Sequence, residues 1–449
     1  MLPLAAIVQG LGAKVAGSDR SFDQGRTPEK FAWMQRKGFR LFPQDGSGVT
    51  SPEQVLVASA AIEATVPEVA RASELGCKRM GRAELLAELF NASPMSIGVA
   101  GTSGKSTTTG MLGWIMAQAG RAPTIMNGAV MKNFVSTDEP FASAVVGGGE
   151  CFVSEVDESD GSIALYRPSV ALLLNVSLDH KSMDELRVLF GDFLTAAGRA
   201  AINVDDAEAR ALAPLAAEPV TFGIDSADAD ISVVPGSIID EATSISAQIV
   251  AAGTAHPLAL PMPGLHNLAN ALAAIAGAYA AGVPVAEAVQ ALHSFKGLAR
   301  RFDIVGTSAS GITVIDDFGH NPEKCRATLR TLKSHPGRVL AFFQPHGYGP
   351  LRQMGAELAQ TFAEELGPED HTILCDPVYF GGTVDRSEGS ERIVRLMQNE
   401  GASAEYIANR DDCAIRLSKL ARTGDRIVIM GARDDTLTEF AHQVLARFS

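Results

Sequence analysis

Residues 95–120 read MSIGVAGTSGKSTTTGMLGWIMAQAG, an apolar run followed by a glycine-rich turn, a lysine and a helix-like segment. The run 95–101 predicts a buried strand, and residues 106–120 predict a helix. Gly101 and Gly104 allow backbone N–H groups to converge on an anion, because no side chain stands in the way. The start of the helix adds the positive end of its dipole at the same place. This order of elements predicts a phosphate-binding loop in an α/β fold.

The side chains of this loop suit a nucleoside triphosphate with Mg²⁺. Lys105 would neutralise the β- and γ-phosphates, and the Ser106 hydroxyl is a candidate Mg²⁺ ligand. Val99 stands where the usual P-loop spacing has its first glycine, so the loop is a compact variant. An ordinary glycine turn before a helix is the alternative interpretation. The predicted phosphate-binding residues are Gly101, Thr102, Ser103, Gly104, Lys105, Ser106 and Thr107.

The composition limits the possible partners. The 449 residues carry 38 basic and 52 acidic side chains, a formal net charge of −14, which argues against a nucleic-acid surface. No apolar run is long enough to span a membrane, and no basic residue precedes the apolar start of the chain. Five scattered cysteines without a CxxC pair indicate free thiols in a reducing compartment. We therefore expect a cytoplasmic protein that binds neither nucleic acid nor membrane.

The alternation of apolar runs and helix-like segments predicts an α/β protein with three domains. Residues 1–93 predict a Rossmann-like domain, but the first strand and its glycine turn are missing, so the true start is expected upstream of Met1. Residues 94–298 predict a central parallel sheet, extended between about 215 and 262 by antiparallel hairpins. Residues 299–449 predict a second Rossmann-like domain.

Polar residues follow several of the predicted strands, at the sheet edge where open α/β sheets bind ligands. Glu155 ends the strand in CFVSEVD and is a candidate Mg²⁺ ligand, with Asp157 and Glu158 as supporting candidates. A solvated acidic turn is the alternative for this cluster. His180 follows the next apolar run, where a neutral imidazole suits a metal, although an isolated histidine is more often structural.

Two further stretches offer ligand-binding side chains. HNLAN supplies His266, Asn267 and Asn270, which can contact adenine or cap a helix. Arg300 and Arg301 are candidates for clamping phosphate, with a surface salt bridge as the alternative. The adjacent pair Asp316 and Asp317 closes the first strand of the third domain and is expected to meet the ribose or Arg301.

The compact pattern GTSGKS resembles the Mur ligase family, the ATP-dependent amide-forming enzymes of peptidoglycan precursor assembly. The resemblance covers the whole chain. Within the family, the chain looks most like the branch that adds L-alanine to UDP-N-acetylmuramate and the related enzymes that reattach recycled peptides. The further stretches that carry it, in the family's order, are EVDESD (155–160), NVSLDH (175–180), GLHNLANALAA (264–274), RRFD (300–303), DDFGHNPEK (316–324), FQPHGYGPLR (343–352) and MGARDD (430–435).

The resemblance implies a ligase that joins L-alanine to UDP-N-acetylmuramate through an acyl phosphate, with ATP and Mg²⁺. The nucleotide sugar would bind the first domain, ATP the second, and the amino acid or peptide the third. The catalytic residues it implies are Lys105, Glu155, His180, Arg301 and His346. The metal ligands are Ser106, Glu155 and His180, and the nucleotide contacts beyond the loop are His266, Asn267, Asn270, Arg301 and Asp316.

The sequence departs from the family in the third domain. His346 and Tyr348 are present, but Gly347 stands where the L-alanine-adding enzymes carry an arginine, and the next arginine is Arg352. Asn321 likewise replaces a common second histidine. Because a guanidinium is the natural fork for a carboxylate, another amino acid or a recycled peptide remains an alternative acceptor. A non-catalytic ATP-binding relative, and a transporter ATPase or kinase, are the alternatives from other classes.

Overall fold

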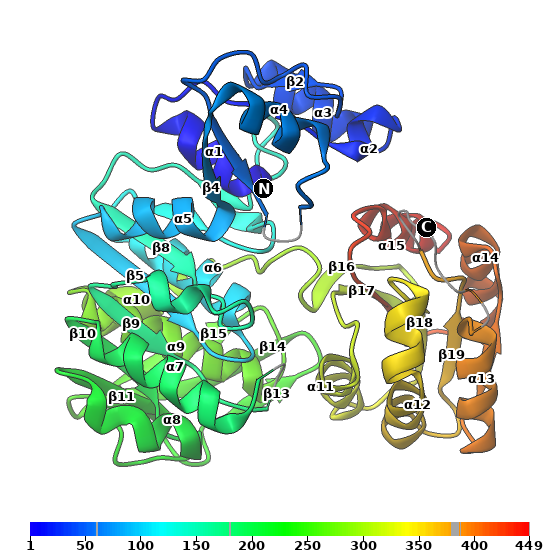
Figure 1. The fold of residues 1–449 in the computed structure, drawn as a ribbon. Coiled ribbons are helices and arrows are strands. Elements are labelled where there is room, and N and C mark those ends of the chain that lie inside the picture. Colours follow the sequence, from blue (N-terminus) through cyan, green and yellow to red (C-terminus); the bar gives the residue numbers. More distant parts are fainter. Residues whose placement is uncertain (60–61, 179–180, 379–385, 387, 449) are drawn as a thin grey trace. The chain divides into compact units, whose positions relative to one another are not determined.

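The computed structural model describes residues 1–59, 62–178, 181–378, 386 and 388–448. The protein is an α/β protein, as the sequence predicts, and its chain divides into two compact units (Figure 1). Unit 1 comprises 1–239, 245–261 and 265–296, and unit 2 comprises 240–244, 262–264 and 297–449. The finer division at residue 93 stays a prediction.

The first part of unit 1 alternates strands and helices, beginning with a helix as the sequence predicts. Its strands form two separate parallel pairs, β1 with β2 and β3 with β4, in place of the single sheet expected. The elements are α1 (Leu2–Gly10), β1 (Ala16–Ser18), α2 (Arg20–Asp23), α3 (Pro28–Arg36), β2 (Arg40–Phe42), β3 (Val55–Ala58), α4 (Pro67–Leu75), β4 (Lys78–Gly81) and α5 (Arg82–Asn91).

A large, mainly parallel sheet forms the rest of unit 1, with β5 near its middle. Its strands lie in the order β13-β14-β12-β11-β10-β9-β5-β8-β6-β7, and β15 pairs with β14. They are β5 (Met95–Ala100), β6 (Thr124–Met126), β7 (Ala144–Val145), β8 (Cys151–Glu155), β9 (Val170–Leu173), β10 (Arg199–Asn203), β11 (Pro219–Gly223), β12 (Ile231–Val233), β14 (Ser244–Ala251) and β15 (Thr254–Leu260), and β13 is Ile239–Glu241.

The predicted antiparallel addition begins later in the chain than expected. β11 and β12 continue the parallel sheet, since β11 pairs in parallel with both β10 and β12. Antiparallel pairing starts only where β14 joins β12 and β15 joins β14. The prediction that residues 220–224 belong to the antiparallel addition is therefore wrong.

Helices cover this sheet, and the β5–α6 connection carries the glycine-rich loop. All residues of β5 except Met95 are buried, so the strand is anchored in the core. The helix that follows packs against α9, and both present nearly continuous buried faces. The helices are α6 (Lys105–Gln118), α7 (Met183–Thr195), α8 (Ala207–Leu212), α9 (Leu265–Ala280) and α10 (Val285–Leu292), with single 3-10 turns at Lys132–Phe134, Ser162–Leu165 and Ala213–Leu215.

Unit 2 is a doubly wound domain on a sheet of order β16-β17-β21-β18-β19-β20, with β16 antiparallel. One hydrophobic cluster joins one face to α11, α12 and α13, and another joins the other face to α14 and α15 (Figure 1). The elements are β16 (Asp303–Thr307), β17 (Thr313–Asp317), α11 (Pro322–Lys333), β18 (Val339–Gln344), α12 (Tyr348–Glu365), β19 (His371–Leu374), α13 (Ser390–Asn399), β20 (Ala404–Tyr406), α14 (Arg410–Leu420), β21 (Arg426–Gly431) and α15 (Thr436–Ala446).

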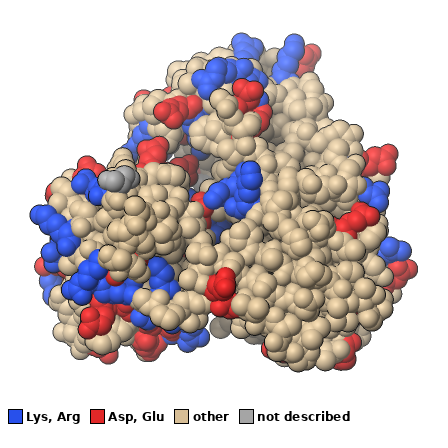
Figure 2. Space-filling view, turned by 180° about the vertical axis from the view of Figure 1, so that it is seen from behind, with Lys and Arg blue, Asp and Glu red and all other residues tan. Residues whose placement is uncertain are grey.

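The cysteines agree with the expectation of free thiols. Figure 2 shows acidic and basic side chains interspersed on the visible face, without one continuous basic surface. Within the described part of the chain, no helix has the length and apolar character needed to cross a bilayer. All five cysteines are buried and free.

Candidate active site

The glycine-rich loop connects the end of β5 to the first turn of α6 in the shape that phosphate binding requires. Gly101 has a φ of 140° and Gly104 a φ of 86°, conformations that favour glycine. The space at Gly104 is also closed, because a Cβ there would lie 2.4 Å from the Asn270 amide oxygen. Both the backbone and the close approach of α9 therefore require glycine at position 104.

Asn175, just beyond β9, holds the loop in place. Its side-chain oxygen accepts hydrogen bonds from the Thr102 hydroxyl and the Ser103 backbone N–H, both at 2.8 Å. Its side-chain nitrogen donates to the Ser103 carbonyl at 3.1 Å. β9 lies beside β5 in the sheet, so a residue 72 positions away in sequence fixes the loop from the neighbouring strand. Nothing in the local sequence around Asn175 indicates this role.

Lys105 is paired with a buried carboxylate. Its ammonium donates to the two carboxylate oxygens of Glu158 at 2.9 and 3.2 Å, and to the Gly101 carbonyl at 2.6 Å. The Glu158 side chain is 4% exposed and the Lys105 side chain 17%. The lysine therefore lies across the loop, and Glu158, which the sequence suggested as a supporting metal ligand, is the counter-ion of Lys105.

Glu155 and Ser106 converge beside Gly128. One Glu155 carboxylate oxygen accepts a hydrogen bond from the Gly128 N–H at 2.5 Å. A Cβ at Gly128 would lie 3.1 Å from that oxygen and 3.5 Å from the Ser106 hydroxyl, so this glycine leaves room for both groups. Carboxylate and hydroxyl oxygens are the donors that Mg²⁺ prefers, and the residues present thus fit this ion.

The third predicted metal ligand, His180, lies outside the described residues. Among the residues that are described, no three His, Cys, Asp or Glu side chains cluster as a metal site would require. The oxygen donors that the structure brings together are accordingly those of Ser106 and Glu155.

The predicted adenine contacts lie on the first turns of α9, and their environments differ. His266 is exposed, whereas Asn267 is buried with 1% of its surface accessible. The Asn270 side-chain oxygen accepts a hydrogen bond from the Thr108 hydroxyl of α6 at 3.2 Å. Asn270 thus ties α9 to the helix that follows the phosphate loop, and His266 is the most accessible of the three.

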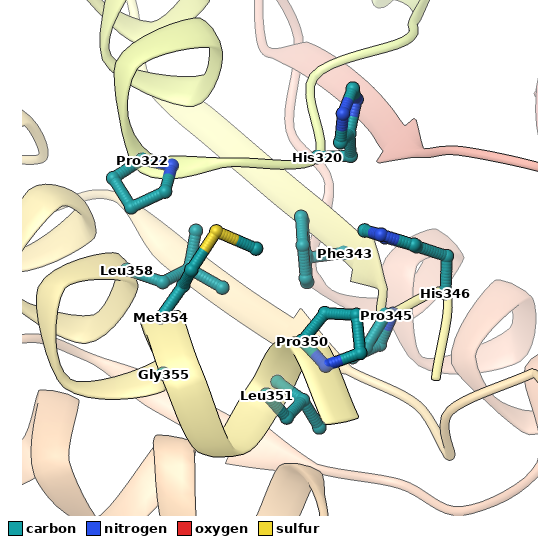
Figure 3. Close-up of a pocket in the computed structure, with 10 residues that line it drawn as sticks. All are labelled: His320, Pro322, Phe343, Pro345, His346, Pro350, Leu351, Met354, Gly355 and Leu358. Atoms are coloured by element: carbon teal, nitrogen blue, oxygen red, sulfur yellow. The ribbon is translucent and has the colours of Figure 1, made fainter. Parts of the chain in front are cut away.

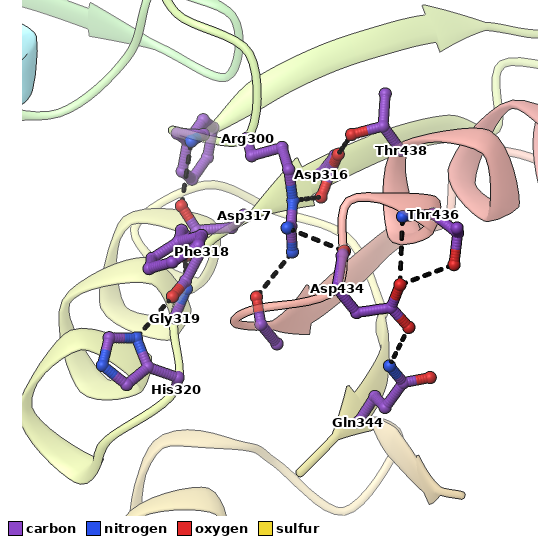
Figure 4. Close-up of polar contacts among 12 residues, drawn as sticks. Arg300, Asp316, Asp317, Phe318, Gly319, His320, Gln344, Asp434, Thr436 and Thr438 are labelled. Carbon is purple, nitrogen blue, oxygen red and sulfur yellow. Dashed lines mark hydrogen bonds and ion pairs between the residues drawn. The ribbon is translucent and has the colours of Figure 1, made fainter. Parts of the chain in front are cut away.

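In unit 2, the two adjacent arginines have different surroundings. Arg300 is buried, and its guanidinium donates to the carbonyls of Gly431 at 2.6 Å and Asp434 at 2.9 Å (Figure 4). Arg301 is half-buried and its guanidinium lies 4.7 Å from the centre of the Phe318 ring. Arg300 therefore has a structural role, and the expected role of Arg301 in binding phosphate stays a prediction.

Asp316 is the partner of Arg300. Its carboxylate lies 3.5 Å from the Arg300 guanidinium and accepts a 2.8 Å hydrogen bond from the Thr438 hydroxyl. The residue has no accessible surface, and burial raises the pKa of its carboxyl to about 6. The carboxylate is fully buried against Arg300 and Thr438, and its expected contact with the nucleotide stays a prediction. Asp317 is likewise used inside unit 2, accepting from the N–H groups of Phe302 and Gly319.

Two histidines stand at the carboxyl ends of β17 and β18. The rings of His320 and His346 lie edge to face with their centres 5.2 Å apart, at one end of a small hollow of about 10 Å³ (Figure 3). Its other walls are mainly apolar, including Phe343, Leu351 and Met354. His346 was expected in the site from the sequence, whereas His320 was not, although both follow buried strands.

The protonation of His320 follows from its surroundings. Its Nδ1 lies 2.8 Å from the Phe318 carbonyl, which can only accept, so Nδ1 carries the proton and Nε2 the lone pair. Burial lowers the pKa of His320 to about 4, and burial together with the Arg433 charge lowers the pKa of His346. Both rings are therefore neutral at pH 7.

Three models of known protein families match the chain. The Mur ligase middle domain matches residues 99–278, the Mur ligase catalytic domain matches residues 1–94, and the Mur ligase glutamate ligase domain matches residues 300–433. The chain belongs to the Mur ligase family.

Relatives of this Mur ligase match it over nearly their whole length. The chain is 33% identical to the UDP-N-acetylmuramate–L-alanine ligase of Streptomyces avermitilis, with 100% of this chain and 95% of the relative covered. It is also 33% identical to the enzyme of that name from Cereibacter sphaeroides, covering 100% and 94% of the two chains.

Solved structures share the fold of this Mur ligase. The UDP-N-acetylmuramate-alanine ligase of Thermotoga maritima superimposes with a TM-score of 0.80 at 22% identity, over 100% of this chain and 96% of that one. A murein peptide ligase from Psychrobacter arcticus gives a TM-score of 0.71 at 24% identity, covering 100% and 96%. At these identities the likeness shows the fold, and it leaves the acceptor to be inferred from other observations.

Proposed function

We propose that this Mur ligase joins L-alanine to the carboxyl group of UDP-N-acetylmuramate and hydrolyses ATP to ADP and phosphate in the process. The full-length relatives with that name support the proposal. The observation that carries it is the convergence of the glycine loop, Lys105 and Glu155 at one edge of a parallel sheet. This combination suits phosphoryl transfer, in which positioning and charge neutralisation supply most of the catalysis.

In the first step, a carboxylate oxygen of the sugar acid attacks the γ-phosphorus of ATP. The bond from that phosphorus to the ADP oxygen breaks, which leaves an acyl phosphate and ADP. We assign the backbone N–H groups of the loop, from Gly101 to Thr107, to the phosphates and Lys105 to the charge on the transferred phosphoryl group. We further assign His266 and the neighbouring Asn267 and Asn270 to the adenine side.

Mg²⁺ would be held by Ser106 and Glu155, together with His180, and would supply charge neutralisation on the phosphate oxygens. Glu158 has a different task in this proposal. It holds Lys105 close to the loop before ATP binds, and the lysine exchanges this carboxylate for phosphate oxygens when the nucleotide arrives. Because Glu158 is buried, its carboxylate keeps the Lys105 ammonium near the loop and away from water.

In the second step, the amino group of the acceptor attacks the carbonyl carbon of the acyl phosphate. The tetrahedral intermediate collapses, the carbon–oxygen bond to phosphate breaks, and the amide nitrogen loses a proton. We assign Arg301 to the phosphate that leaves and His346 to the acceptor. His320 adds a neutral imidazole whose Nε2 lone pair can accept a hydrogen bond from the amine.

Gly347 removes an arginine expected in the region that binds the acceptor. A murein peptide ligase is among the structures with the same fold, which keeps a recycled peptide as the second candidate acceptor. Since ATP and UDP-sugars are cytoplasmic metabolites, either acceptor implies a cytoplasmic enzyme.

Turnover with a panel of acceptors tests the proposed function. The protein, ATP, Mg²⁺ and UDP-N-acetylmuramate are mixed with L-alanine, glycine, L-serine, D-alanine or an L-alanyl-D-glutamyl peptide. Phosphate release and the mass of the product are measured, with a mixture lacking any acceptor as the control. We expect phosphate and the amide product in equal amounts with L-alanine. Product with the peptide alone would establish the alternative acceptor, and ATP binding without any product would contradict a ligase.

A further inference from the structure

The turn that follows β21 holds an arginine in an unusual backbone conformation. Arg433 has a φ of 61°, in the left-handed region that favours glycine over residues with a Cβ. The residue is exposed, and no hydrogen bond or ion pair joins its side chain to another residue in the described ranges. A strained backbone that presents a guanidinium to solvent calls for a functional explanation.

The residues on either side fix this turn. Arg300 donates to the carbonyls of Gly431 and Asp434, which flank Arg433 in the chain. The Asp434 carboxylate in turn accepts a 2.7 Å hydrogen bond from the side chain of Gln344 at the end of β18 (Figure 4). The backbone on both sides of Arg433 is therefore fixed, and the side chain extends from a rigid turn.

The strand register places Arg433 at the same sheet edge as His346. β18 and β21 are parallel neighbours in which Gln344 is the partner of Gly431. His346 follows Gln344 by two residues and Arg433 follows Gly431 by two, so both leave the same sheet edge at the same level. The lowered pKa of His346 agrees with this placement, since its causes are burial and then the charge of Arg433.

We propose that Arg433 binds the carboxylate of the acceptor amino acid, and thereby supplies the guanidinium that Gly347 cannot. This inference rests on the proposed ligase function and names a residue of its acceptor site. A guanidinium matches a carboxylate with two parallel hydrogen bonds, and it is always charged at physiological pH. Gly347, with a φ of 135°, has no side chain beside His346. The Arg433 guanidinium, which comes from the end of the neighbouring strand, therefore does not face a second positive charge from position 347.

The test compares L-alanine with L-alaninamide, which keeps the nucleophilic amine but lacks the carboxylate. Wild-type protein is expected to use L-alanine with a kcat/KM about 10- to 100-fold above that for the amide, the range of a charged hydrogen-bonded pair. In Arg433→Gly the value for L-alanine should fall by this factor, while the value for the amide stays unchanged. The KM values for ATP and UDP-N-acetylmuramate should not move.

The glycine variant also separates binding from folding. Glycine adopts the left-handed conformation at position 433 without a Cβ, so Arg433→Gly should have a Tm equal to or above that of the wild type. Arg352→Ala, which removes an exposed arginine from the first turns of α12, is the matched control and should keep the discrimination.

The outcomes are distinct. Wild-type protein that forms no amide with any acceptor would contradict the proposed function and this inference with it. Turnover in which Arg433→Gly still prefers L-alanine over the amide would overturn the inference alone. Loss of the preference in Arg352→Ala in place of Arg433→Gly would also overturn it, and would assign the carboxylate to Arg352.

Discussion

Replacing Lys105 with alanine is expected to lower the rate of ADP formation that depends on UDP-N-acetylmuramate by about 10³-fold or more. The lysine is the only predicted cation of the phosphate loop, and the charge on the transferred phosphoryl group would lose its main protein counter-charge. The measurement is a coupled ADP assay at saturating ATP, with and without the sugar acid. A variant that retains turnover within a few-fold of the wild type would remove the loop from the mechanism.

The partner of Lys105 provides the control for this experiment. Lys105→Ala leaves the Glu158 carboxylate buried without its cation, which costs about 3–5 kcal/mol of stability. The double variant Lys105→Ala/Glu158→Gln removes that uncompensated charge, and its thermal unfolding should return toward that of the wild type. Its activity should stay as low as that of the single variant. Recovery of activity in the double variant would show that the single change acted through folding.

Replacing Arg300 with alanine is expected to destabilise unit 2 by about 3–5 kcal/mol, because the fully buried Asp316 then loses its cation. Two carbonyls of the turn that carries Arg433 lose their donor as well. Hydrogen exchange of peptides from β17 and β21 measures the change inside unit 2. Unchanged protection of both strands would contradict the structural role assigned to Arg300.

The pH dependence of this loss identifies its cause. Burial raises the pKa of Asp316 to about 6, and the charge of Arg300 opposes this rise, so removing Arg300 raises the pKa further. A carboxyl whose pKa is higher in the folded state stabilises the fold below its unfolded pKa of about 4 and loses this contribution as pH rises through the folded value. Arg300→Ala should therefore lower the free energy of unfolding more at pH 8 than at pH 5. Arg300→Ala/Asp316→Asn should lack this difference, and an equal loss at both pH values in the single variant would exclude Asp316 as the cause.

Local sequence features predicted the parts of the site that depend on one element. The glycine loop after β5 follows from the backbone freedom that Gly101 and Gly104 provide and from the apolar run before them. The carboxylate of Glu155 follows from its place at the end of a buried strand. Neither inference needs knowledge of a distant residue, because strand, loop and helix are contiguous in the chain.

Features that depend on packing could not be predicted in the same way. The pair of Lys105 with Glu158 arises because β8 lies next to β5, and the acidic run EVDESD does not indicate which carboxylate turns inward. Arg300 and Arg301 are identical in type and adjacent, so only the folded backbone determines which one is buried. The parallel pairing of β11 is likewise decided by its neighbour β10, since short β-rich runs suit either orientation.

The fate of the carboxylate oxygens of the sugar acid tests the central claim most directly. UDP-N-acetylmuramate labelled with ¹⁸O in both carboxylate oxygens is converted with ATP and L-alanine, and the phosphate released is analysed by mass spectrometry. Because the attacking carboxylate oxygen becomes the bridge of the acyl phosphate and leaves with phosphorus, each phosphate should contain one ¹⁸O atom. Amide product accompanied by unlabelled phosphate would contradict the acyl-phosphate mechanism.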